Sequence, residues 1–120
     1  MNLILLTHAN HTTAGTASTL NTLIALVAFR NEAQATHEKL AELSGKSLPT
    51  IARHMRQLRE SGIVINNEQV PYASYLFHPL YLWRGTAKQR DEYWNSLAPD
   101  HPFKKLLEEL NAVYEDSEEG

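Results

Sequence analysis

Thr50, Arg53 and Gln57 recur at helical spacing, and each carries a side chain that can contact the edge of a DNA base. An arginine can donate two hydrogen bonds to guanine, a glutamine can pair with adenine through two, and a threonine methyl can contact thymine. At 3.6 residues per turn, His54 and Arg56 flank the same face. The pattern predicts that Thr50, Arg53, Gln57 and His54 read bases.

The opposite face of this predicted helix is apolar. Its members are Leu48, Ile51, Ala52, Met55 and Leu58. Ser47 is the expected N-cap, and Pro49 falls in the first turn, where its missing N–H costs nothing. Gly62 should end the helix after Ser61, because glycine adopts the left-handed conformation at least cost.

A shorter helix is predicted just before it, with Thr36 as its N-cap, Glu38 in its first turn and Gly45 at its end. Its apolar face is formed by Leu40, Ala41 and Leu43. Residues 36–62 therefore predict a helix-turn-helix whose second helix lies on DNA.

Charge is segregated along the 120 residues, although the total is only −3. Residues 36–90 hold eight bases and four acids, a net charge of +4, whereas residues 91–120 hold two bases and nine acids, a net charge of −7. A basic middle is suited to a polyanion. The residues expected to contact phosphates are Lys39, Lys46, Ser47 and Arg56.

Composition excludes several classes of protein. The chain is long enough for one domain, and 42% hydrophobic with 21% charged residues is an ordinary globular balance. No cysteine is present, so disulfides and cysteine zinc sites are excluded. The apolar run at residues 1–10 is too short to span a bilayer and lacks a basic leader, so we expect a cytoplasmic protein without membrane contact.

The sequence contains no recognisable catalytic motif. His8 and His11 have the spacing of helical metal ligands, but no third ligand accompanies them, and we expect both to be exposed. His37, His78 and His101 are expected to cap helices, pack or face solvent. With no phosphate-binding glycine loop and no nucleophile elbow, the sequence predicts no enzyme, no catalytic residue, no metal and no cofactor.

The segments before the helix-turn-helix should support it. Residues 3–6 fit either a short strand or the first turn of a helix, and residues 7–19 lack an apolar period, which favours a loop or irregular arm. A scaffold helix is predicted over residues 18–29. It should bury Leu20, Leu23, Ile24, Val27 and Phe29, and Asn31 should end it.

A wing is predicted after Gly62. Residues 63–65 are β-branched, Asn66 and Asn67 favour a turn, and residues 72–77 form an aromatic strand that Pro71 should confine to a sheet edge. The tip, residues 66–71, contains Glu68 but no lysine or arginine. The segment that completes the wing or covers the core contains Tyr81, Leu82 and Trp83.

Two further helices are predicted. Thr86 and Gln89 form a capping box for a helix that ends near Leu97, and Asp100 should cap the last helix. The apolar stripe of that helix contains Phe103, Leu106, Leu107, Leu110, Val113 and Tyr114. The stripe either packs on its own domain or pairs with a second copy, and the expected oligomer is a homodimer. Residues 115–120 should be disordered.

The chain resembles a winged helix over residues 18–84, through LNTLIALV, EKLAELSGKSLPTIARHMRQLRESGIV and the strand pair that follows. More narrowly, YLFHPLYLWRGTAKQRDEYW resembles the RepL-type plasmid replication proteins. Pro79, Trp83, Arg84 and Gly85 recur in order, and His78 stands where asparagine is expected. This resemblance implies origin binding and the start or control of plasmid replication.

The predicted fold is mainly α with a small β-hairpin (α+β), a winged helix-turn-helix with extra C-terminal helices. Its expected divisions are an arm (1–17), the DNA-binding domain (18–85), C-terminal helices with a dimer contact (86–114) and an acidic tail (115–120). The predicted function is sequence-specific double-stranded DNA binding in plasmid replication initiation or copy control, with the replication or transcription machinery as a further partner. The alternatives are a transcriptional repressor and a protein-interaction module on the same scaffold.

Overall fold

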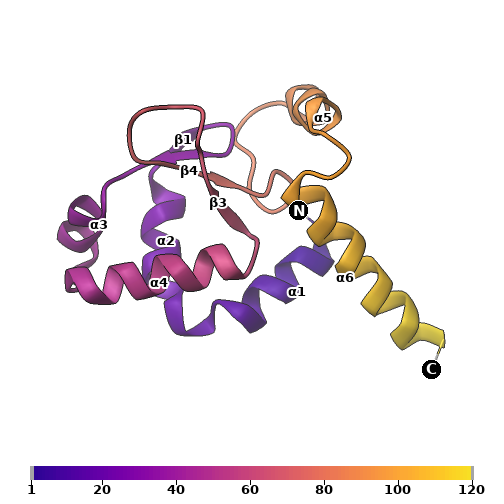
Figure 1. Ribbon diagram of the computed structural model, residues 1–120, viewed down its shortest axis with the longest axis horizontal. Coiled ribbons are helices and arrows are strands. Elements are labelled where there is room, and N and C mark those ends of the chain that lie inside the picture. Colours follow the sequence, from indigo (N-terminus) through magenta and orange to yellow (C-terminus); the bar gives the residue numbers. More distant parts are fainter. Residues whose placement is uncertain (1, 120) are drawn as a thin grey trace.

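Helices provide most of the computed structural model, which describes residues 2–119 and, of residues 115–119, the backbone alone. In chain order the elements are α1 (Leu3–Thr12), the 3-10 helix η1 (Ala14–Thr16), α2 (Ala17–Ala25), β1 (Val27–Phe29), β2 (Glu32–Gln34), α3 (His37–Ser44), α4 (Leu48–Glu60), β3 (Val64–Asn66), β4 (Ser74–Phe77), α5 (Ala87–Ser96) and α6 (Pro102–Glu119) (Figure 1). The predicted α+β winged helix-turn-helix with extra C-terminal helices is confirmed.

The sheet is larger than the predicted hairpin. Four antiparallel strands lie in the order β1-β2-β4-β3. The wing strands pair with Val64 opposite Phe77, and β2 pairs with the other edge of β4. The prediction that Pro71 confines the second wing strand to an edge is wrong, because this strand begins only at Ser74 and is central.

The predicted scaffold helix over residues 18–29 is too long. α2 ends at Ala25, and the next residues turn into β1, where Phe29 is 55% exposed instead of buried. Arg30 adopts a positive φ of 58° between β1 and β2, and its backbone pairs with that of Arg84. Asn31 does not end a helix: its buried amide donates to the Phe77 carbonyl at 2.7 Å.

The N-terminal segment is helical, so the prediction of a loop or irregular arm over residues 7–19 is wrong. The Asn2 side chain caps α1 by accepting from the Leu5 N–H, and Leu5 and Ala9, one turn apart, are buried. Two buried positions are enough because α1 packs against α6 as well as the domain (Figure 1). Because only these two residues of α1 are buried, the sequence shows no apolar period that would predict the helix.

The core lies between the inner face of the sheet and the helices. Ile51, Met55 and Leu58 of α4 are fully buried in it, together with Leu40 of α3. The predicted apolar faces were too wide: Leu43 and Leu48 are about half exposed, and Ala52 is exposed. Tyr81 is buried and Leu82 packs against the core, as one of the two predicted alternatives requires.

The C-terminal helices are mostly as predicted. The Thr86–Gln89 capping box opens α5. α6 begins at Pro102, and its first turn is capped by His101, whose Nδ1 accepts from the Phe103 N–H at 3.1 Å, so the predicted cap at Asp100 is wrong. The disorder predicted for the tail is not matched, since α6 continues to Glu119; Gly120 lies outside the described residues.

The apolar stripe of α6 is covered along its first turns only. Phe103 is buried, and the next members pack against the core: Leu106, Leu107 and Leu110. Farther along the same stripe Val113 is 59% and Tyr114 36% exposed. Packing on its own domain therefore accounts for the first part of the stripe.

Candidate nucleic-acid interface

Local capping fixes the two helices of the helix-turn-helix. The Thr36 hydroxyl accepts from the Lys39 N–H at 3.1 Å, Gly45 ends α3 with φ 72°, and the Ser47 hydroxyl accepts from the Thr50 N–H at 3.4 Å. Gly62, with φ 78°, follows Ser61 at the end of α4. These predicted caps and stops are confirmed.

The face of α4 opposite the core is available to a ligand. Arg53, Arg56 and Gln57 are exposed on it. Among the described side chains, neither arginine makes an ion pair. Thr50 lies at the edge of this face, half-buried, and its hydroxyl accepts a hydrogen bond from the Ser47 hydroxyl at 2.9 Å. The guanidinium and amide donors of Arg53, Arg56 and Gln57 are therefore accessible to a ligand from solvent.

His54 does not flank this face, and its predicted position there is wrong. It is 7% exposed, and its Nδ1 lies 2.7 Å from the hydroxyl of the buried Thr19 on α2. Burial lowers the pKa of His54, and the positive charges of Arg53 and Lys46 lower it further. Reading a base would require this side chain to leave the core.

The residues predicted to contact phosphates are distributed over α3, α4 and the turn between these helices. Lys46 and Ser47 are exposed in the turn, Lys39 is exposed in the first turn of α3, and Arg56 is exposed on α4. The Ser47 hydroxyl is occupied by its capping bonds to Thr50. Lys39, Lys46 and Arg56 are therefore better candidates for phosphate contact than Ser47.

Sequence reasoning missed two charged residues of α4, Arg59 and Glu60. Arg59 is half-buried and lines a groove of about 950 Å³ beside Asn66, Asn67 and Gln69 of the wing. Glu60 is exposed and lies next to Gln57 in a second, smaller groove. Helical spacing from Arg53 and Gln57 could have placed Glu60 on their face.

The wing is held by Glu32, a residue that the sequence pattern did not single out. One of its carboxylate oxygens accepts from the Asn67 amide at 3.0 Å and the Ser74 hydroxyl at 2.8 Å, and the other accepts from Gln34 at 3.1 Å. These hydrogen bonds, that from Gln34 first, hold the pKa of Glu32 below its ordinary value. Both ends of the wing loop are thus attached to β2.

The residues that carry the narrower resemblance have packing partners. The Trp83 indole donates to the Thr86 carbonyl at 3.1 Å, and its ring lies 5.5 Å from that of Tyr93. The Arg84 guanidinium donates to the Ile24 carbonyl at the end of α2. Trp83 thus attaches the start of α5 to the segment after β4, and Arg84 attaches that segment to α2.

Two other kinds of site find no support among the described residues. No three histidine, aspartate or glutamate side chains are grouped there to hold a metal ion. His11 is exposed as expected, but His8 is half-buried and donates from Nε2 to the Ser61 carbonyl at 2.6 Å, so its expected exposure is wrong. No helix in the described part of the chain has the length and apolar character needed to cross a membrane.

Comparison with known proteins identifies the same region. Residues 20–65 match the family of winged helix-turn-helix DNA-binding domains. The matched span runs from α2 to the middle of β3 and includes both helices of the helix-turn-helix. No curated protein and no solved structure matches the chain significantly. The match supports DNA as the partner of this domain.

Proposed function

We propose that this winged helix-turn-helix protein binds specific double-stranded DNA sequences as a homodimer and acts, without catalysis, in plasmid replication initiation or copy control. The observation that carries DNA binding is the outer face of α4, where Arg53, Arg56 and Gln57 are exposed while the opposite face is buried. A helix whose apolar face is packed against the domain can lie in the major groove with its polar face toward the bases.

Base reading falls to Arg53 and Gln57, with the Thr50 methyl at the edge of the contact. Lys39, Lys46 and Arg56 contact phosphates, which supply affinity and register but not sequence choice. Ser47 contributes by capping α4, so the backbone near the start of the helix is presented in a fixed orientation. His54 supports α4 from behind through Thr19.

Two copies are proposed because one interface is small. The wing tip carries Glu68 and no lysine or arginine, so it adds little attraction to phosphate. Two recognition helices on half-sites about one DNA turn apart multiply a weak single contact. The exposed end of the α6 stripe is the proposed contact between the copies.

The role in replication rests on the resemblance of residues 75–94 to RepL-type proteins. A transcriptional repressor would use the same interface, and the two differ in where the bound sites lie. Selection of bound fragments from the source genome, with the sites mapped relative to origins and promoters, distinguishes them.

Substitution of one base-reading and one phosphate-contacting residue tests the interface. Arg53→Ala should cost about 1–3 kcal/mol on the selected site and relax the preference at one base pair, because a bidentate contact to guanine is lost. Lys46→Ala should weaken binding to selected and random duplexes alike and reduce the slope of log affinity against log salt by about 1. Both are measured by fluorescence anisotropy across a salt series.

Equal losses on both duplexes for Arg53→Ala would remove its base-reading role. If the folded wild-type protein binds no duplex at low salt, the DNA-binding proposal itself fails. The interaction-module alternative would then be the better account of the exposed surfaces.

A further inference from the structure

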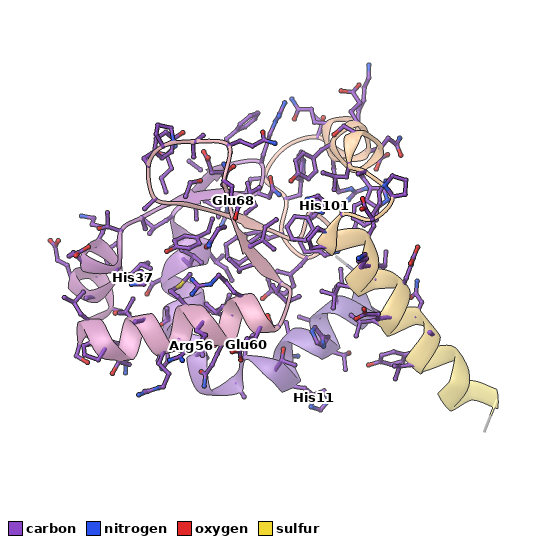
Figure 2. The ribbon with its side chains drawn as sticks, in the orientation of Figure 1. His11, His37, Arg56, Glu60, Glu68 and His101 are labelled. Carbon is purple, nitrogen blue, oxygen red and sulfur yellow. The ribbon has the colours of Figure 1, made fainter. Side chains whose placement is uncertain are left out.

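Glu60 is an acidic side chain on the face of α4 that is otherwise basic and amide-bearing. It is the last residue of α4, it is exposed, and it follows Arg53 and Gln57 at positions i+7 and i+3. Residues at this spacing lie along one line of a helix. Figure 2 shows Arg56, Glu60 and His11 along the same edge of the molecule.

Glu60 does not stabilise the helix that carries it. The C-terminal end of a helix has partial negative charge, so a carboxylate in the last turn is unfavourable there. Arg56 lies four residues earlier, which is the weaker order for a helical ion pair. Among the described residues Glu60 makes no ion pair, either with Arg56 or with another base.

The end of α4 is nevertheless held in place. His8 on α1 donates to the carbonyl of Ser61, the residue after Glu60, at 2.6 Å, and the Ser61 hydroxyl donates to the Leu58 carbonyl at 2.5 Å. Between α1 and α4 lies a groove of about 370 Å³ with His11 on one side and Gln57 and Glu60 on the other. The carboxylate thus starts from a firmly placed backbone, beside a residue proposed to read a base.

A carboxylate presented to DNA repels phosphate unless it finds a donor. The major groove exposes two kinds of amino group, N4 of cytosine and N6 of adenine. A carboxylate favours cytosine N4, because the acceptor N7 lies beside N6 on adenine and repels the second carboxylate oxygen. We infer that Glu60 is a specificity-determining residue that accepts a hydrogen bond from cytosine next to the base contacted by Gln57, and that weakens binding wherever this cytosine is absent. This inference rests on the proposed function, since it requires α4 to lie in the major groove.

The test is Glu60→Gln in the full chain, with the bound sequences selected from a random duplex pool. The wild type should select a C:G pair at one position of each half-site, and the variant should lose about tenfold of that preference and accept adenine there, because glutamine pairs with adenine. Binding of the variant to random duplex should become severalfold tighter, since one repulsive charge is gone. Its unfolding temperature should be unchanged or higher.

Glu42→Gln is the matched control, because Glu42 is also an exposed acid in the last turn of its helix, α3, and the substitution changes the net charge equally. It should leave the selected sequence unchanged. The inference is overturned if Glu60→Gln selects the same site with the same preference as the wild type, or if both variants change binding alike. A wild type that selects no sequence would instead overturn the proposed function.

Discussion

Among single residues, His78 is a buried titratable group that connects three elements of the fold. It is fully buried, its Nε2 donates to the Phe103 carbonyl at 2.9 Å, and its Nδ1 accepts from the Leu80 N–H at 3.2 Å. Its ring lies 5.5 Å from that of Trp94 and 4.9 Å from that of Phe103. The neutral ring with its proton on Nε2 therefore connects β4, α5 and α6.

Stability should fall as the solution is acidified, because burial lowers the pKa of His78 from 6.5 to about 4. Below pH 6.5 the unfolded chain binds a proton that the folded chain still excludes, so the free energy of unfolding falls until the pH reaches about 4. The full loss from this group is about 3 kcal/mol. Urea unfolding between pH 7.5 and pH 4 measures it.

His78→Asn serves as the comparison, since asparagine can donate and accept here but does not titrate. It should be less stable than the wild type at pH 7 and have a flatter dependence on pH. The remaining slope should come in part from His54 and His101, whose pKa values burial also lowers. Identical pH dependence in the two proteins would show that His78 is not the titrating group.

At the scale of elements, the wing is positioned by a neighbouring strand and not by its own sequence. Asn67 and Ser74, at the two ends of the loop, donate to the same oxygen of Glu32 on β2. Asn67 and Ser74 also pair through their backbones at 2.9 Å. Since β2 leads directly into α3, the wing and the helix-turn-helix share one support.

Glu32→Ala should loosen the wing, because two donors lose their shared acceptor. Amide hydrogen exchange of residues 67–74 should become faster, while exchange in α4 should change little. Gln34→Ala is the comparison, since it removes only the exposed 3.1 Å bond to the other carboxylate oxygen. Equal exchange in the loop of all three proteins would mean that the backbone pairing alone holds the wing.

Across the whole molecule, the acidic end of α6 lies away from the helix-turn-helix. The principal dimensions are 46 × 32 × 22 Å, and α6 ends far from α3 (Figure 1). Residues 115–120 include four of the fourteen acids of the chain. This separation disfavours binding of the acidic end of α6 to the basic face of α4 in the same copy. The acids can still repel DNA through the solvent.

Removal of residues 115–120 should tighten non-specific DNA binding at low salt, because it changes the net charge from −3 to +1. The gain should disappear near 0.15 M salt, where charges are screened over about 8 Å. Substitution of the four acids by glutamine or asparagine in the full chain should reproduce the effect. A gain that persists at high salt would point to a direct contact with the DNA-binding face.

The helix-turn-helix could be predicted from the amino-acid sequence, because the residues that begin and end its helices act on backbone groups only a few positions away. Thr36, Gly45, Ser47 and Gly62 act on neighbouring backbone groups, and the apolar period of α4 identifies the side that is buried. The capping box of α5 was predictable for the same reason. The outer line of Arg53 and Gln57 follows directly from that period.

Features that depend on partners far along the chain could be recognised only in the folded protein. The β1–β2 hairpin requires Asn31 to meet Phe77 and Arg30 to pair with Arg84. His54 is drawn into the core by Thr19, 35 residues away. Local propensity cannot supply such contacts, because the free energy that settles them comes from burial and hydrogen bonding between distant segments.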